Sequence, residues 1–235
     1  MSQAAPSTEL LAMHGWAGDS RGWQPWSEQA AARGWGFRCG ERGYGALPVL
    51  EPAWSAGSVQ RVVIGHSLGP HLLPAQVWAQ ATAVVLLASF AGFVPPGRAG
   101  KGLRTALRGM AQRLESGDTT AMLRDFFRQV AAPYPVSALP PGPLEQGISS
   151  DGQQRLLDDL QLLAAIEALP AGFPQGVPVL LVEANDDQIV VEASRALLRQ
   201  ALPHATVWTL SRAGHGLLQP DLPERVLGWI ADAQL

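Results

Sequence analysis

Short continuous runs of apolar residues recur along the chain and are separated by more polar stretches. Continuous runs are typical of strands buried on both faces of a parallel sheet, whereas alternating runs indicate strands with one face in water. The runs predict strands at residues 10–13, 62–64, 83–87, 177–182 and 205–210, with a weaker candidate at 36–39.

Helical patterns lie between these runs. They cover residues 22–33, 68–80, 188–201 and 221–233. Strands that alternate with helices indicate βαβ units, in which helices cover both faces of a parallel sheet. The predicted fold class is therefore α/β, with a mostly parallel central sheet.

Residues 92–170 break this alternation, because they contain no convincing strand. Apolar residues recur there at helical spacing in two groups, which a cluster of Pro and Gly at 133–142 divides. The groups are Met122, Leu123, Phe126, Phe127 and Val130, and then Leu156, Leu157, Leu160, Leu163 and Ile166. We therefore predict a core formed by 1–91 and 171–235, with a helical cap inserted at 92–170. Such an insertion is well placed to cover a site at the strand ends.

The composition narrows the possible partners and compartments. The 235 residues carry 17 basic and 20 acidic side chains, which excludes the strongly basic footprint of a nucleic-acid-binding protein. No apolar run approaches the roughly 20 residues that span a membrane, and the first residues lack the basic and apolar parts of a secretory signal. Cys39 is the single cysteine, so no intramolecular disulfide can form. We expect a soluble, cytoplasmic monomer without membrane attachment.

The segment Gly65-His66-Ser67-Leu68-Gly69 follows one predicted strand and leads into a predicted helix. In this context G-x-S-x-G indicates a nucleophile elbow, a tight turn that presents the serine at the carboxyl edge of the sheet. The same turn directs the backbone N–H of Leu68 towards the reaction centre. The alternative is an ordinary Gly/Ser turn between a strand and a helix.

A serine nucleophile needs a base, and the base needs an acid that orients it. His215 follows the last predicted strand, in a glycine-containing loop that leads into the final helix. Asp186 and Asp187 both stand at the end of the strand predicted at 177–182. Two adjacent carboxylates cannot both face one imidazole, so single Asn substitutions should separate them. A capping or surface role is the alternative for His215.

Together, His14-Gly15-Trp16, the elbow motif, Asp187-Gln188-Ile189-Val190 and Gly214-His215 resemble the α/β-hydrolase family across essentially the whole chain. The chain order in that family is Ser, acid, His. The resemblance therefore implies that Ser67 is the nucleophile, Asp187 the acid and His215 the base. It also implies an oxyanion hole formed by the backbone N–H groups of Trp16 and Leu68, and it implies no metal or organic cofactor.

Within the family, the His-Gly-Trp turn, the short chain and the cap segment 152–161 are similar to the carboxylesterases that cleave pimeloyl-[acyl carrier protein] methyl ester in biotin synthesis. This resemblance implies a serine carboxylesterase that hydrolyses an acyl methyl ester, with an acidic acyl carrier protein as partner. The alternatives are a thioesterase, a lactonase, a lyase-like enzyme of menaquinone synthesis, or a non-catalytic protein that binds a ligand.

The charge of the cap is consistent with an acidic partner, because residues 92–128 contain seven basic and only three acidic side chains. Arginine suits carboxylates and phosphates through bidentate contacts. The candidates for carrier-protein contact are Arg98, Lys101, Arg104, Arg108, Arg124 and Arg128. A solvated helix face is the alternative. The candidate substrate-binding residues are Met122, Phe126 and Phe127, which either line an acyl channel or seat the cap on the core.

Overall fold

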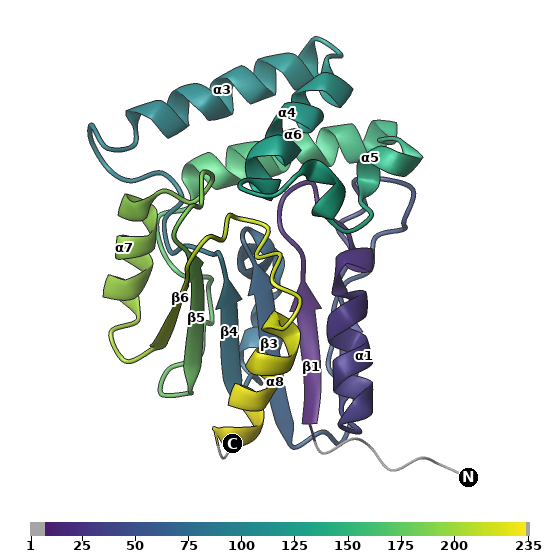
Figure 1. The fold of residues 1–235 in the computed structure, drawn as a ribbon, viewed down its shortest axis with the longest axis vertical. Helices are drawn as coiled ribbons and strands as arrows, with labels where there is room; N and C mark the ends of the chain where they lie inside the picture. The colour runs from purple at the N-terminus through teal and green to yellow at the C-terminus, as the bar shows by residue number, and fades with distance from the viewer. Residues whose placement is uncertain (1–7, 234–235) are drawn as a thin grey trace.

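A computed structural model describes residues 8–233, so residues 1–7 and 234–235 of the predicted core lie outside the described part. Its centre is a sheet of six parallel strands in the order β2-β1-β3-β4-β5-β6 (Figure 1). The strands are β1 (Thr8–Met13), β2 (Gly36–Cys39), β3 (Gln60–His66), β4 (Ala83–Leu87), β5 (Val179–Ala184) and β6 (Thr206–Leu210). All six strand predictions are confirmed.

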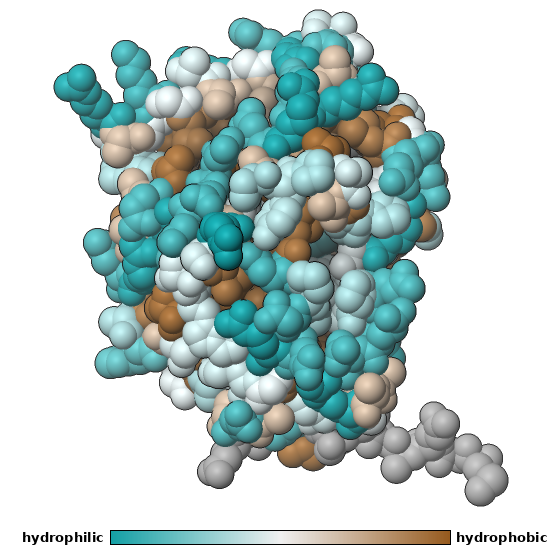
Figure 2. Space-filling model, in the orientation of Figure 1, coloured by the Kyte–Doolittle hydropathy of each residue, from teal (hydrophilic) through white to brown (hydrophobic). Residues whose placement is uncertain are grey.

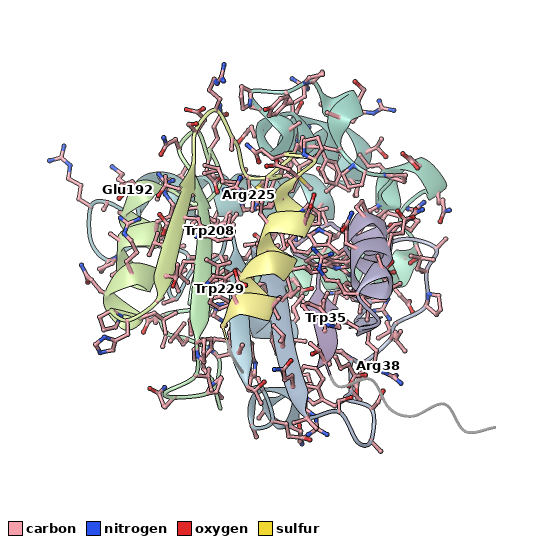
Figure 3. The ribbon with its side chains drawn as sticks, turned by 60° about the horizontal axis from the view of Figure 1, so that its bottom comes forward. Trp35, Arg38, Glu192, Trp208, Arg225 and Trp229 are labelled. Carbon is pink, nitrogen blue, oxygen red and sulfur yellow. The ribbon has the colours of Figure 1, made fainter. Side chains whose placement is uncertain are left out.

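Helices cover both faces of the sheet, which explains why the inner strands β1, β3, β4 and β5 are largely apolar. On one face, α1 (Gln24–Ala32) and α8 (Leu222–Asp232) pack on Leu10 and Ala12 of β1. On the other face, α2 (Ala75–Trp78) and α7 (Glu192–Ala201) pack on Leu11 and Met13. The α1/α8 face also carries half-buried tryptophans at its margin, namely Trp35, Trp208 and Trp229 (Figure 3). Arg225 lies over the Trp208 ring, with its guanidinium carbon 5.4 Å from the ring centroid.

The helix predicted at 68–80 is wrong as a single element. A 3-10 turn spans Gly69–Leu72, the chain is extended at Leu73 and Pro74, and only then does α2 begin. Pro70 is tolerated because it stands in the first turn, where its missing N–H would be unpaired anyway. Pro74 disfavours the helical conformation of the residue before it, and Leu73 accordingly has ψ 137°.

The predicted helical block at 92–170 contains no strand among its residues, all of which the structure describes. Its helices are α3 (Lys101–Glu115), α4 (Thr119–Ala131), α5 (Pro143–Gln146) and α6 (Ser150–Ala165), with a 3-10 turn at Val136–Ala138. They lie across the carboxyl ends of the strands, with α6 beneath α3 (Figure 1). Ser149 caps α6 by accepting a hydrogen bond from the backbone N–H of Gly152 over 2.9 Å.

The strand order brings the ends of β1 and β3 together. From β1 the chain first forms β2 on one side and then β3 on the other, and Met13 of β1 pairs with Gly65 of β3. Where the winding direction of an open parallel sheet reverses, the two departing loops leave a crevice at the carboxyl edge. The His14–Gly18 segment and the turn at Ser67 are those two loops, and the cap lies above them.

Candidate active site

Ser67 occupies the tight turn after β3 with φ +55°, in the left-handed region that non-glycine residues rarely adopt. Such a conformation costs about 1–3 kcal/mol and persists only where its surroundings hold it. Here the Ser67 N–H donates to the Leu87 carbonyl over 2.9 Å, and the Ser89 hydroxyl donates to the Ser67 carbonyl over 2.8 Å. The backbone on both sides of the turn is therefore fixed by the end of β4.

Glycines permit this turn to lie against the end of β1. A Cβ on Gly69 would lie 2.2 Å from the Met13 carbonyl oxygen, and one on Gly15 would lie 2.8 Å from the Ser67 Cβ. Gly65 faces Pro70 in the same way, because its Cβ would lie 2.4 Å from the proline Cγ. The spacing of the G-x-S-x-G motif thus has a steric cause in this chain.

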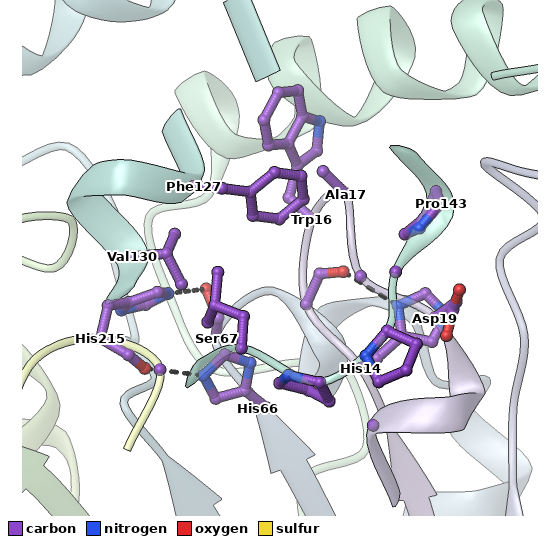
Figure 4. A pocket seen from close by; sticks show the side chains of 18 of the residues that line it. His14, Trp16, Ala17, Asp19, His66, Ser67, Phe127, Val130, Pro143 and His215 are labelled. Atoms are coloured by element: carbon purple, nitrogen blue, oxygen red, sulfur yellow. Dashed lines mark hydrogen bonds between the residues drawn. The ribbon is translucent and has the colours of Figure 1, made fainter. Parts of the chain in front are cut away.

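Ser67, His215 and Asp187 form a continuous chain of hydrogen bonds. His215 Nε2 lies 3.0 Å from Ser67 Oγ, and His215 Nδ1 lies 2.9 Å from Asp187 Oδ2. The second carboxylate oxygen of Asp187 accepts the backbone N–H groups of Ile189 and Val190 over 2.8 and 2.9 Å. Figure 4 shows the Ser67–His215 pair at the wall of a pocket.

The protonation pattern of this chain follows from the environment of Asp187. Burial alone would raise the pKa of its carboxyl, but the neighbouring His215 and the two backbone N–H donors lower it below its ordinary value. An ionised carboxylate can only accept, so His215 Nδ1 carries the proton and donates it. Nε2 is then free to accept the Ser67 hydroxyl proton.

The structure distinguishes the two adjacent carboxylates. Asp187 has a fully buried side chain against His215, whereas Asp186 is exposed and contributes its backbone N–H to the Ala213 carbonyl over 2.9 Å. That backbone bond ties the end of β5 to the loop that carries His215.

Trp16 and Leu68 lie beside Ser67 with unused donors. Among residues 8–233, neither backbone N–H has a hydrogen-bond acceptor. The Trp16 side chain is committed elsewhere, because its indole N–H donates to the Leu156 carbonyl of α6 over 2.9 Å. Its ring also meets Phe126 of α4 edge to face, with centroids 4.9 Å apart.

Sequence reasoning assigned no role to His66, the residue before Ser67. Its Nε2 donates to the backbone carbonyl of His215 over 3.0 Å, and the two imidazole rings lie 5.0 Å apart. Burial, together with the nearby His215, lowers the pKa of His66 to about 4, so this second imidazole is neutral near pH 7. In the sequence, the position of His66 inside the G-x-S-x-G motif could have indicated that it lies beside Ser67.

Two cavities meet at Ser67. The first, which we call the His215 cavity, has a volume of about 450 Å³ and is bordered by His66, His215 and Phe127. The second, the cap cavity, has a volume of about 370 Å³ and extends below α3 along Leu107 and Met122. Trp16, Ser67 and Phe126 border both. Met122, Phe126 and Phe127, the candidate substrate-binding residues, therefore all face one or both cavities.

The six basic candidates on the cap are exposed and border neither cavity. Arg128 pairs with Asp125, and Arg104 donates to the Pro95 and Gly97 carbonyls. The remaining four have no carboxylate within ion-pair distance in the described chain: Arg98, Lys101, Arg108 and Arg124. In Figure 2 hydrophobic surface is visible below α3 and along the junction between the cap and the body.

Residues 8–233 contain neither a cluster of metal-binding side chains nor a helix that could span a membrane. No three His, Cys, Asp or Glu side chains are grouped as a metal ion requires. No helix in that range is long and apolar enough to cross a membrane.

No protein-family model matches the sequence, and no curated protein matches it either. Solved structures do resemble the fold. An esterase from Exiguobacterium antarcticum has a TM-score of 0.72 at 14% identity, over 99% of this chain and 94% of that one. A bromoperoxidase from Bacillus anthracis has 0.73 at 16%, over 97% and 94%. An α/β hydrolase from a deep-sea metagenome of the Medee basin has 0.67 at 14%, over 100% and 93%.

These likenesses, with the six-stranded parallel sheet and its covering helices, show that the chain has the α/β-hydrolase fold. The predicted fold class is confirmed. Proteins described as an esterase and as a bromoperoxidase share this fold at similar scores. The reaction must therefore be argued from the residues around Ser67.

Proposed function

We propose that this protein is a serine hydrolase that cleaves carboxylic esters, with Ser67 as nucleophile, His215 as base and Asp187 as the orienting acid. The observation that carries the proposal is the unbroken hydrogen-bond chain Ser67–His215–Asp187, whose serine borders two cavities. A serine alone is a weak nucleophile, and this arrangement is the one that activates it.

In the first half-reaction Ser67 Oγ attacks the ester carbonyl carbon while its proton moves to His215 Nε2. The carbonyl oxygen becomes an oxyanion, and the free backbone N–H groups of Trp16 and Leu68 stabilise it. The tetrahedral intermediate collapses when His215 Nε2 returns its proton to the alcohol oxygen, so the alcohol leaves and an acyl-serine remains. In the second half-reaction water takes the place of the alcohol, and hydrolysis restores the serine.

Asp187 supports both halves by keeping Nδ1 protonated and by stabilising the imidazolium that forms. Asp187→Asn should therefore lower kcat by about 10⁴-fold, the loss seen where an amide imposes the wrong tautomer. Asp186→Asn is the matched control, since Asp186 is exposed and offers only its backbone to the site. Equal losses in the two variants would contradict the assignment.

The test of the function is chemical labelling together with turnover. Wild-type protein should react with a fluorophosphonate probe at Ser67 and hydrolyse short p-nitrophenyl esters. Ser67→Ala should lose both, while Ser116→Ala, which changes an exposed serine on the cap, should lose neither. Wild-type turnover by Ser67→Ala would show that the activity resides elsewhere.

For the substrate, we propose the methyl ester of an acyl chain carried by acyl carrier protein, as the resemblance to the biotin-pathway esterases implies. The support from the structure is the exposed basic face of the cap, where four cations have no acidic partner in residues 8–233. These four cations would attract the acidic side chains of a carrier protein.

Charge reversal on this face separates carrier recognition from ester chemistry. Lys101→Glu with Arg108→Glu should raise KM for a carrier-linked ester at low salt and leave p-nitrophenyl ester turnover unchanged. Arg33→Glu, at the end of α1 in the body, is compared with each single cap reversal as the control for net charge. Complementation of a biotin auxotroph that lacks its own esterase would test the pathway, with Ser67→Ala as the negative control.

A further inference from the structure

Ser67 is the meeting point of two cavities of similar size, and they differ in which part of the proposed machinery they contain. His215, Gly216 and Leu217 border the His215 cavity, and none of them borders the cap cavity. The Trp16–Phe126 ring pair, which borders both, stands between the two spaces. The two ends of a substrate bound at Ser67 can therefore extend into two different cavities.

Proton transfer from His215 determines which cavity holds the alcohol portion of the ester and which holds the acyl chain. The alcohol oxygen must receive its proton from His215 Nε2, so the alcohol portion of the ester must lie on the His215 side. The oxyanion occupies the donors at Trp16 and Leu68. The acyl chain must then extend in the remaining direction, into the cap cavity.

The linings match this division. The cap cavity is bordered by flexible aliphatic side chains, among them Leu103, Met110 and Met122, which suit an extended acyl chain. The His215 cavity is bordered by larger or stiffer groups, including Trp23, Trp26 and Pro140, together with Leu139. Its volume of about 450 Å³ lies within the range of about 300–1,000 Å³ of pockets that hold drug-sized ligands. Methanol requires only a small part of that space.

Charge at the far end of the His215 cavity limits the ligand further. Asp19 and Glu145 border it, and Arg21 is the one cation of residues 8–233 that lies within ion-pair distance of both. Figure 4 shows Asp19 at the side of the pocket away from His215. This local excess of negative charge disfavours an anionic alcohol such as a phosphate-bearing one.

We propose that the His215 cavity is a binding site for a bulky, uncharged, apolar alcohol, and that the protein hydrolyses esters of such alcohols as well as methyl esters. The inference rests on the proposed function, because it needs Ser67 and His215 to act as described. It adds a substrate class that a methyl ester does not require.

The test compares esters of one acid that differ only in the alcohol. With a constant butyryl group, kcat/KM for the benzyl ester should exceed that for the methyl ester by tenfold or more, since each buried methylene equivalent contributes roughly 10-fold or more to such discrimination. Leu139→Trp should fill the His215 cavity and lower the ratio of benzyl to methyl ester kcat/KM at least tenfold. Leu139→Met, which preserves the side-chain volume, is the matched control.

A second variant tests the other cavity. Met110→Trp should shorten the preferred acyl chain in a methyl ester series and leave the ratio of benzyl to methyl turnover unchanged. If methyl esters are hydrolysed as fast as benzyl esters, or if Leu139→Trp lowers both equally, the cavity assignment is overturned while the hydrolase stands. Absence of all ester turnover, together with absence of Ser67 labelling, would instead overturn the proposed function and this inference with it.

Discussion

A buried carboxylate, Asp159, is among the groups that tie the cap to the body, and removing its charge should destabilise the fold. Asp159 of α6 is 1% exposed and accepts three hydrogen bonds from the segment after β2. Arg42 donates from Nε and Nη2 over 2.8 Å each, and the Tyr44 hydroxyl donates over 2.6 Å. Burial and the adjacent Asp159 raise the pKa of Tyr44, which keeps its hydroxyl a donor.

The expected cost of Asp159→Asn follows from these contacts. Removing one partner of a buried ion pair costs about 3–5 kcal/mol, because the other charge stays behind uncompensated. The Arg42 side chain is 32% exposed, so water offsets part of that loss. We expect the free energy of unfolding to fall by about 2–3 kcal/mol. At roughly 2–4 °C per kcal/mol for a chain of this size, Tm should fall by about 4–12 °C.

Thermal and urea unfolding followed by circular dichroism would measure the effect. Asp158→Asn is the matched control, since the neighbouring carboxylate is exposed on the same helix and bonds only to Gln154. A double-mutant cycle with Arg42→Met isolates the ion pair, and a coupling of at least about 1 kcal/mol is expected. The reasoning is refuted if Asp159→Asn unfolds like Asp158→Asn, or if the cycle gives no coupling.

Two further changes test the elbow and its histidine. Gly69→Ala should destabilise the fold and abolish ester turnover, because its Cβ would lie 2.2 Å from the Met13 carbonyl oxygen. Gly102→Ala in helix α3, with nothing within 4 Å of its Cβ, should not lower Tm in the same melts, and equal Tm values for the two variants would refute the steric account. The pKa of His66 falls from 6.5 to about 4 on folding. Between these two pH values the unfolded chain binds a proton at this imidazole and the folded protein does not. The free energy of unfolding therefore decreases as the pH falls from 6.5 to about 4. His66→Gln should flatten this pH dependence in urea unfolding and His204→Gln, at an exposed position, should not; an unchanged slope in His66→Gln would contradict the assignment.

The four inner strands of the sheet, β1, β3, β4 and β5, could be predicted because they are largely buried on both faces. Residues such as Leu10 and Leu11 belong to different hydrophobic clusters on opposite sides of β1, yet both are fully buried. Continuous apolar runs therefore marked these four strands clearly, whereas the run at 205–210 marked β6 although this edge strand is mostly exposed. The edge strand β2 was the weaker candidate, because its residues are only partly buried and its sequence is correspondingly mixed.

The helix at 68–80 was mispredicted although its local cause was visible. Apolar periodicity continues across Pro74, whereas the effect of that proline is short-range and falls on Leu73. The error shows that a local steric rule outweighs periodicity where the two disagree.

The site was predictable where chain order limits the choices and not where contacts are made across the fold. Ser67 and His215 each stood out by their position after a strand. The residues alone left Asp186 and Asp187 open, and the family resemblance implied Asp187. In the structure the Asp187 carboxylate faces His215 and Asp186 is exposed. The wall between the two cavities was beyond sequence reasoning, because it joins Trp16 to Phe126 of a different part of the chain.

The cap is also built into the arrangement around Ser67. The N–H of Gly216, next to His215, donates to the Val130 carbonyl at the end of α4 over 3.0 Å. Trp16 is held to α6 through the Leu156 carbonyl, and Phe126 of α4 completes the wall between the cavities. The segment that carries Trp16 and the loop that carries His215 are thus each hydrogen-bonded to a cap helix. A movement of α4 or α6 would therefore displace the proposed base or the proposed oxyanion donor, which makes these two helices part of the site and not merely its cover.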